Sequence, residues 1–195
     1  MEVALIDSPV ANVANIARAL REVGADLRIS RDANVIRTAE KIVLPGVGSF
    51  ASAMQWLCEF SIDKAIRTAI SNGASLLGVC VGHQLLFDVS HEMGTTPGLG
   101  LLRGEIRQFV GPLPVPQIGW NRVEFSRGPL FEGSADFYFV NSYAVIDAPD
   151  EIARADYGGP FTAAVQRERV FGVQFHPEKS SAAGLRVLRN FIAWT

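Results

Sequence analysis

Short, mainly apolar runs that alternate with helical patterns constrain the fold of this chain more than any other feature. These runs cover residues 3–6, 27–29, 42–44 and 76–79. Their length and apolar content are typical of strands buried on both faces of a sheet. Strands that alternate with helices form parallel βαβ units with right-handed crossovers. The sequence therefore predicts an α/β fold. We expect a single three-layer domain over residues 1–195, with a mainly parallel open sheet and helices on both faces.

Two helical segments between these runs have recognisable ends. Apolar residues at helical spacing predict a helix that begins at Asn12, a suitable N-cap, and stops at Gly24. A second helix is expected over residues 62–70 and ends before Gly73. Each glycine can adopt the left-handed conformation that commonly terminates a helix.

The pattern changes after Gly111. Three prolines at alternating positions impose an extended path, and alternating or aromatic runs follow at residues 137–140, 143–146, 162–165 and 170–175. We interpret these runs as strands, with antiparallel ones added to the sheet. Apolar residues at helical spacing from Leu185 to Ile192 then predict a closing helix.

Composition narrows the range of partners. A net charge of −2 and a pI near 5.9 argue against nucleic acid or an anionic membrane. No apolar run approaches the roughly 20 residues of a membrane span, and acidic Glu2 does not suit a signal peptide. We therefore expect a cytoplasmic protein. Only 19% of residues are charged. Two explanations of this low fraction are equally favoured: a partner covers apolar surface, or a parallel sheet is well buried.

The two cysteines of the chain lie in different sequence contexts. Cys58 and Cys80 form no zinc-binding pattern and no disulfide framework. No other cluster of residues indicates a metal or an organic cofactor. Cys58 lies directly after Met-Gln-Trp-Leu at residues 54–57, and we expect it to contribute to packing.

Residues 78–82 (Gly-Val-Cys-Val-Gly) place Cys80 at a predicted strand-to-helix turn. This has the form of a nucleophile elbow with cysteine in place of serine. Flanking glycines let neighbouring backbone pass closely, and the apex side chain projects above the carboxyl edge of the sheet, where open α/β folds bind ligands. The N–H groups at the helix start lower a thiol pKa and can bind an oxyanion. A small buried hydrophobe is the alternative role for Cys80.

His176 ends a predicted strand and is followed by Pro177 and Glu178. Residues i and i+2 of an extended chain share a face, so Glu178 can hold one ring nitrogen of His176 and leave the other for a proton. A surface histidine at a strand end is the alternative. Cys80, His176 and Glu178 together fit the scheme of an activated nucleophile.

A third candidate is the loop at residues 45–48 (Pro-Gly-Val-Gly), directly after a predicted parallel strand. A tight loop of this kind can aim backbone N–H groups at a developing negative oxygen. Alone it is a weak signal, because proline and glycine end many strands.

Together these three segments resemble the class I (triad) glutamine amidotransferases. The segment from Gly78 to Gln84 is similar to the nucleophile segment of that class, and residues 176–178 resemble its His-Pro-Glu. Within the class, the chain most resembles the glutaminase subunits of imidazole glycerol phosphate synthase. The segments that carry this resemblance are 45–48, 118–121 (Ile-Gly-Trp-Asn), 138–143 (Tyr-Phe-Val-Asn-Ser-Tyr) and 171–191.

The chain departs from that family at three places. The family usually has Asp-Tyr-Gly-x-Gly-Asn near its start, where residues 7–12 read Asp-Ser-Pro-Val-Ala-Asn. Losing both glycines stiffens a loop near the expected glutamine and interface region. Asn141 replaces a common His, and His83 replaces a common Met. None of these changes involves the three residues of the candidate triad.

The resemblance implies a glutaminase that supplies ammonia to a (β/α)-barrel cyclase as a heterodimer. Cys80 would attack the amide of L-glutamine, His176 would move the proton, and Glu178 would orient His176. The backbone of Val47, Gly48 and Val81 would form the oxyanion hole. The resemblance also implies glutamine contacts and cyclase contacts. The glutamine contacts are Gln84, Ser142 and Tyr143, and the cyclase contacts are Trp120, Asn121 and Lys179.

In the reaction that the resemblance implies, the cyclase makes imidazole glycerol phosphate and AICAR in histidine biosynthesis. Two alternatives stay open. The chain could instead supply ammonia to another synthase, such as one for sugar amidination, or could be a catalytically silent regulatory subunit. The identity of the partner, the rates and affinities, and the effect of the altered 7–12 loop do not follow from the sequence.

Overall fold

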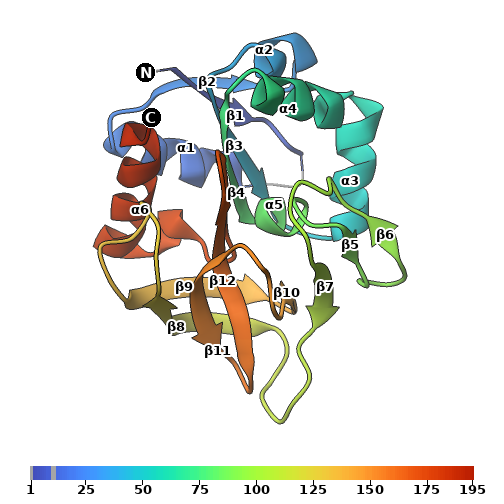
Figure 1. Cartoon of the computed structure of the whole chain (residues 1–195), viewed down its shortest axis with the longest axis vertical. Coiled ribbons are helices and arrows are strands. Elements are labelled where there is room, and N and C mark those ends of the chain that lie inside the picture. Colours follow the sequence, from blue (N-terminus) through green and yellow to red (C-terminus); the bar gives the residue numbers. More distant parts are fainter. Residues whose placement is uncertain (1, 10–11) are drawn as a thin grey trace.

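The computed structural model describes residues 2–9 and 12–195. These residues form two sheets, a nine-stranded mixed sheet with helices on both faces and a smaller four-stranded sheet (Figure 1). The large sheet has the order β2-β1-β3-β4-β13-β12-β11-β8-β9. Its first five strands pair in parallel. They are β1 (Glu2–Ile6), β2 (Asp26–Ser30), β3 (Lys41–Gly46), β4 (Ser75–Cys80) and β13 (Val170–Val173). The four apolar runs lie in this parallel part, which confirms the predicted α/β fold.

Antiparallel strands extend the sheet beyond β13. They are β12 (Pro160–Arg167), β11 (Glu151–Asp156), β8 (Gln117–Phe125) and β9 (Ala135–Asn141). The run at 143–146 belongs elsewhere: β10 (Tyr143–Val145) pairs with β7 (Glu105–Gln108) in the small sheet. The other two strands of that sheet are β5 (Val89–Ser90) and β6 (Thr96–Pro97).

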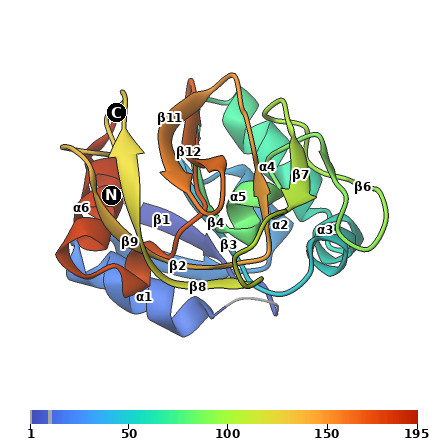
Figure 2. The ribbon, with the colours of Figure 1, turned by 90° about the horizontal axis from the view of Figure 1, so that it is seen from below.

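Helices lie on both faces of the large sheet (Figures 1 and 2). One face carries α1 (Val13–Glu22) and α6 (Ser181–Ala193), which pack against each other. The other carries α2 (Ala33–Arg37), α4 (Ile62–Ser71) and the short α5 (Val81–Gln84), with α3 (Phe50–Glu59) beside α4. One 3₁₀ turn, η1 (Pro177–Lys179), precedes α6.

The predicted helix ends are confirmed. Asn12 caps α1, because its side chain accepts a hydrogen bond from the Asn15 N–H. Gly24 and Gly73 follow α1 and α4 with φ of +89° and +94°, where a side chain would be strained. Four residues of each helix at helical spacing are buried. They are Ile16, Ala17, Ala19 and Leu20 in α1, and Ile62, Ala65, Ile66 and Ala69 in α4.

Phenylalanine side chains join the antiparallel strands to the end of β13. Phe137 stacks on Phe175 with ring centroids 4.0 Å apart, and Phe139 contacts both Phe175 and Phe161 edge to face. All four rings are buried. Burial of each ring contributes about 1.5–3 kcal/mol, so β9, β12 and the chain before His176 are held in one unit.

The expected packing role of Cys58 is wrong. The buried face of α3 consists of Phe50, Ala53, Met54 and Leu57, at the spacing of a single helical stripe. Cys58 follows Leu57 by one residue, which turns it about 100° away from that stripe, and it is exposed.

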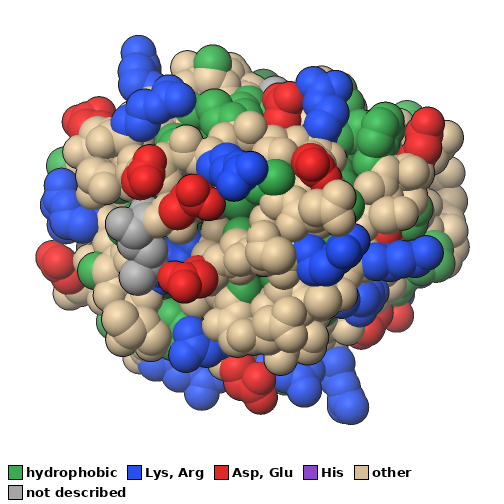
Figure 3. Space-filling model, turned by 90° about the horizontal axis from the view of Figure 1, so that it is seen from above, with side chains coloured by type: hydrophobic (Ala, Val, Ile, Leu, Met, Phe, Trp, Pro, Cys, Tyr) green, Lys and Arg blue, Asp and Glu red, His purple; other side chains and the backbone are tan. Residues whose placement is uncertain are grey.

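The surface shows no preference for one sign of charge on the face drawn in Figure 3, where acidic and basic side chains are interspersed. In the described part of the chain, no helix has the length and apolar content needed to cross a bilayer.

Candidate active site

Cys80 lies at the turn between β4 and α5, as the elbow pattern predicts. Its backbone has φ of 56° and ψ of −113°, a conformation in which a residue with a side chain is strained. The residue is only 3% exposed. The parallel strands end at this edge of the sheet, so the thiol lies at the ligand-binding edge of an open α/β fold.

The glycines around Cys80 are required by close backbone approach. A Cβ on Gly46 would lie 2.7 Å from the Gly82 nitrogen, and one on Gly78 would lie 2.6 Å from the Gly82 oxygen. A Cβ on Gly82 would collide with the Leu44 carbonyl. The elbow therefore packs directly against the end of β3, which brings the loop at 46–48 beside Cys80.

His176 follows β13 and is held by its backbone. Its N–H donates to the Tyr138 carbonyl over 2.9 Å. The Ser180 hydroxyl donates to the His176 carbonyl over 2.6 Å and accepts from the Tyr138 N–H over 2.9 Å. Ser180 is buried. It therefore fixes the end of β13 against β9, a role that sequence reasoning missed because its two contacts come from different segments.

Glu178 lies beside the imidazole, as the i, i+2 spacing predicts. The His176 Nδ1 and a Glu178 carboxylate oxygen are 2.9 Å apart, and both side chains are 5% exposed. Pro177 begins the turn η1 rather than continuing the strand, yet the two side chains still meet. An Nδ1–H that donates to Glu178 leaves Nε2 free to accept a proton.

The pKa of His176 reflects opposing effects. Burial lowers it, but hydrogen bonds with the Cys80 and Glu178 side chains, and the negative charge of both groups, outweigh burial and raise the pKa to about 10. The imidazole is therefore stabilised as a cation beside Cys80, whose thiol lies 3.8 Å from the Val140 carbonyl.

A cavity of about 330 Å³ opens in front of Cys80. This volume suits a small ligand. The cavity brings together most of the residues that the sequence singled out, and a few more. Its lining consists of Val47, Gly48, Cys80, Val81, Gln84, Glu92, Pro116, Val140, Asn141, Ser142, Tyr143, His176 and Lys179.

Glu92 is a cavity residue that sequence reasoning missed. It follows β5, and one carboxylate oxygen accepts from the Phe50 N–H over 2.7 Å. A lone glutamate in a loop carries no signal in the sequence. Its place at the cavity depends on the pairing of β5 with β7, which is a long-range contact.

The structure separates two residues that were predicted to share an interface. Trp120 is 55% exposed and lies edge to face with Tyr138 on the outer side of β8. Asn121 lies on the opposite side of the same strand, because successive side chains alternate. Its amide donates to the Asp156 carbonyl over 2.8 Å.

In the altered loop at residues 7–12, Asp7 pairs with Arg31 over 2.7 Å. Val10 and Ala11 lie outside the described residues. The predicted effect of losing the two glycines of this loop therefore stays a prediction.

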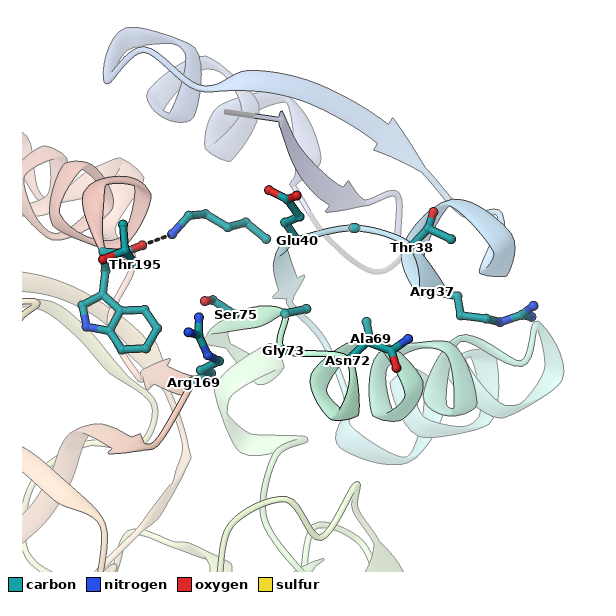
Figure 4. A pocket seen from close by; sticks show the side chains of 13 residues that line it. Arg37, Thr38, Glu40, Ala69, Asn72, Gly73, Ser75, Arg169 and Thr195 are labelled. Atoms are coloured by element: carbon teal, nitrogen blue, oxygen red, sulfur yellow. Dashed lines mark hydrogen bonds between the residues drawn. The ribbon is translucent and has the colours of Figure 1, made fainter.

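A second hollow, of about 490 Å³, lies at the opposite edge of the sheet, where β3 and β4 begin (Figure 4). Its Lys41 amine donates to the Phe191 carbonyl over 2.9 Å and to the Trp194 carbonyl. This cation therefore holds the end of α6. Since open α/β sheets bind ligands at their carboxyl ends, we assign the active site to the smaller cavity at Cys80. Within the described residues, no group of three or more potential ligands could hold a metal.

His83 is fully buried directly after the elbow, and neither ring nitrogen has a hydrogen-bond partner among the described residues. Its ring lies edge to face with Phe87. Burial lowers the pKa of His83 from 6.5 to about 3. The folded protein therefore holds this imidazole neutral over a pH range in which the unfolded chain protonates it.

We expect His83→Met to make the protein less sensitive to acid. Because the folded pKa lies below the unfolded value, His83 reduces the free energy of unfolding as pH falls below 6.5, by up to about 1.4 kcal/mol per pH unit. His176, with its raised pKa, acts in the other window, between pH 6.5 and about 10. Urea unfolding at several pH values measures the free energy of unfolding of the wild type and of His83→Met. Parallel curves for the wild type and His83→Met below pH 6.5 would contradict this account of His83.

The fold and the site are those of an amidotransferase. The family model "Glutamine amidotransferase class-I" matches residues 4–194, and the chain belongs to this family. Curated relatives then narrow the resemblance. The chain is 43% identical to the imidazole glycerol phosphate synthase subunit HisH of Moorella thermoacetica, over 97% of this chain and 93% of that protein. It is 41% identical to HisH of Caulobacter vibrioides, over 98% of both.

Solved structures agree on the fold. One described as a glutamine amidotransferase superposes with a TM-score of 0.79 at 20% identity, covering 97% of this chain and 96% of the other. A chain of PurLQS from Thermotoga maritima superposes with a TM-score of 0.73 at 19% identity, covering 98% of this chain and 97% of the other. At these identities the likeness concerns the fold alone.

Proposed function

We propose that residues 1–195 form one amidotransferase domain that acts as the cytoplasmic glutaminase subunit of an imidazole glycerol phosphate synthase. The observation that carries the proposal is that the Cys80 elbow and His176, paired with Glu178, line one cavity, in a chain 43% identical to HisH over nearly its whole length. The test supplies purified chain and cyclase subunit with glutamine as the only nitrogen source. Formation of both imidazole glycerol phosphate and glutamate is the expected result.

The chemistry requires three side chains and no cofactor. The Cys80 thiolate attacks the side-chain carbonyl of L-glutamine, and the tetrahedral intermediate collapses to a thioester as His176 protonates the departing ammonia. Water, deprotonated by His176, then attacks the thioester and releases glutamate. Glu178 orients the imidazole and stabilises its charged form.

The oxyanion of each tetrahedral intermediate needs backbone donors. We assign these to the N–H of Val81, at the start of α5, and to the loop containing Val47 and Gly48. The first N–H groups of a helix have no acceptor within the helix, so the Val81 N–H is suited to this role. Close approach of Gly46 to Gly82 keeps the loop beside the elbow.

Substrate recognition falls to the remaining cavity residues. We assign glutamine contacts to Gln84 and to the Ser142–Tyr143 segment, all of which line the cavity. Glu92 contributes a carboxylate to the same cavity. A carboxylate is the natural partner of the α-ammonium group of an amino acid, so we assign Glu92 to that group.

The partner surface continues from the cavity along β8 and β9. On their outer side, Ile118 pairs with Val140 and Trp120 pairs with Tyr138, and the Lys179 amine lies 5.8 Å from the centre of the Tyr138 ring. Ile118 is 63% exposed. Val140 and Lys179 also line the cavity. We propose that a (β/α)-barrel cyclase covers this surface and receives ammonia directly from the cavity.

Trp120→Ala tests the docking surface. A central aromatic anchor commonly contributes about 2 kcal/mol, so we expect the Kd for the cyclase to rise about 30-fold. Because Trp120 is exposed, the melting temperature of the free chain should change little. Titration calorimetry and thermal melting measure the two quantities. A melting temperature that falls while the Kd stays unchanged would mean that Trp120 stabilises the chain and does not bind the partner.

A further inference from the structure

Two carboxamide side chains at the cavity donate to one backbone carbonyl, and a third carboxamide joins them through Gln84. Gln84 donates its amide N–H to the Tyr143 carbonyl over 2.9 Å, and Asn141 donates to the same oxygen over 3.1 Å. Gln84 also donates to the side-chain oxygen of Gln174 over 3.0 Å. All three carboxamides are at least 94% buried.

The carbonyl of Tyr143 fixes the direction of every one of these amides. A carbonyl oxygen only accepts hydrogen bonds, so the nitrogens of Gln84 and Asn141 must face it. The second hydrogen of the Gln84 nitrogen then points to Gln174, which must present its oxygen. One backbone oxygen therefore determines the orientation of three side chains.

In this arrangement, only one group of the Gln84 side chain is available to bind a ligand. Both hydrogens of its nitrogen are used within the protein, so only its carbonyl oxygen is available, and that oxygen accepts. L-Glutamine carries N–H donors at its amide and its α-ammonium group. Gln84 can therefore bind glutamine only as an acceptor, and only while Tyr143 and Gln174 hold its amide in this orientation.

We propose that Gln174 is a positioning residue for glutamine binding, because it holds the Gln84 carboxamide with its oxygen available to the substrate. This inference rests on the proposed function. Gln174 is fully buried on the strand end that leads to His176, and its own amide nitrogen has no partner among the described residues. Such a group is costly to bury, and an apolar side chain would avoid that cost. Stability alone therefore does not account for a glutamine at this position.

The experiment compares Gln174→Met with the wild type in the complex with the cyclase. Met has nearly the same length but accepts no strong hydrogen bond. Loss of one well-placed contact to bound glutamine should raise KM about tenfold with little change in kcat, as for an interaction made equally in ground and transition states. The rate of Cys80 alkylation by iodoacetamide should not change, since that reagent does not use Gln84.

Gln117→Met is the matched control. Gln117 is also buried, and its amide oxygen also lacks a partner among the described residues, but the hydrogen bonds of the Gln84 amide in that part of the chain go to Tyr143 and Gln174 and not to Gln117. Its KM for glutamine should stay at the wild-type value. Thermal melting of each variant reports any loss of stability. If Gln174→Met does not fold, Gln174→Leu replaces it. This second variant also removes the acceptor for Gln84, and the same rise of about tenfold in KM is expected.

A double-mutant cycle decides whether Gln174 acts through Gln84. If it does, Gln84→Met together with Gln174→Met should raise KM no more than Gln84→Met alone. Additive effects, or an unchanged KM in Gln174→Met, would overturn the inference while leaving the glutaminase assignment intact. A wild-type complex without glutaminase activity would instead reject the proposed function itself.

Discussion

Replacing Cys80 with alanine should abolish glutamine-dependent synthesis of imidazole glycerol phosphate by the complex. The reason is that Cys80 is the only thiol among the described residues that line the cavity, so without it no thioester can form. Loss of a member of a catalytic triad typically lowers kcat by on the order of 10⁴–10⁶-fold. Steady-state release of glutamate and formation of the cyclised product measure the loss.

The complex that contains Cys80→Ala should still make imidazole glycerol phosphate from ammonium salts, because the cyclase carries out that chemistry. Cys58→Ala is the matched control, since Cys58 is exposed on α3, and it should retain full glutamine-dependent activity. Glutamate release by Cys80→Ala at the wild-type rate would show that the triad assignment is wrong. Loss of the ammonium-dependent reaction as well would mean that the cyclase in the sample is inactive, and the comparison would be repeated with active cyclase.

The second large effect concerns the free subunit. We expect it to release glutamate on the order of 10²–10³-fold more slowly than the complex with cyclase ligand bound, which is the typical cost of one missing oxyanion donor. Gly48 has φ of +82°, while β-branched Val47 does not adopt positive φ. The peptide between these two residues can therefore flip at Gly48, and only one of its two orientations aims an N–H at the oxyanion.

The cyclase, and its ligand-bound form in particular, would then activate the subunit by binding the flipped state more tightly than the resting state. Glutamate release is measured for the free chain, the complex, and the complex with cyclase ligand. Gly48→Ala provides a direct check. Alanine resists the positive φ of the resting loop, so it should favour the flipped state and increase the rate of glutamate release by the free chain. Equal rates in all three wild-type samples would mean that the oxyanion hole is already complete in the free subunit.

The parts of this molecule that follow from local pattern could be predicted from the sequence. The apolar runs at 3–6 and 76–79 became parallel strands because their residues are buried on both faces. The glycines around Cys80 predicted its elbow because only glycine tolerates the backbone contacts found there. Glu178 was predicted beside His176 because two-residue spacing keeps side chains on one face.

The parts that depend on tertiary contacts could not. Ser180, Glu92 and Gln174 each act through partners far along the chain, and their residue types alone carry no signal. The placement of β10 in the small sheet follows from its pairing with β7. Cys58 lies in an apolar-looking segment, but its position one residue past the buried stripe of α3 exposes it.

The central claim is that this chain releases ammonia at Cys80 and passes it to a cyclase. The most direct test supplies the complex with glutamine carrying nitrogen-15 in its amide group, together with an excess of unlabelled ammonium. Direct transfer from the cavity predicts imidazole glycerol phosphate that carries the label. Product nitrogen that matches the unlabelled ammonium of the medium would contradict the account.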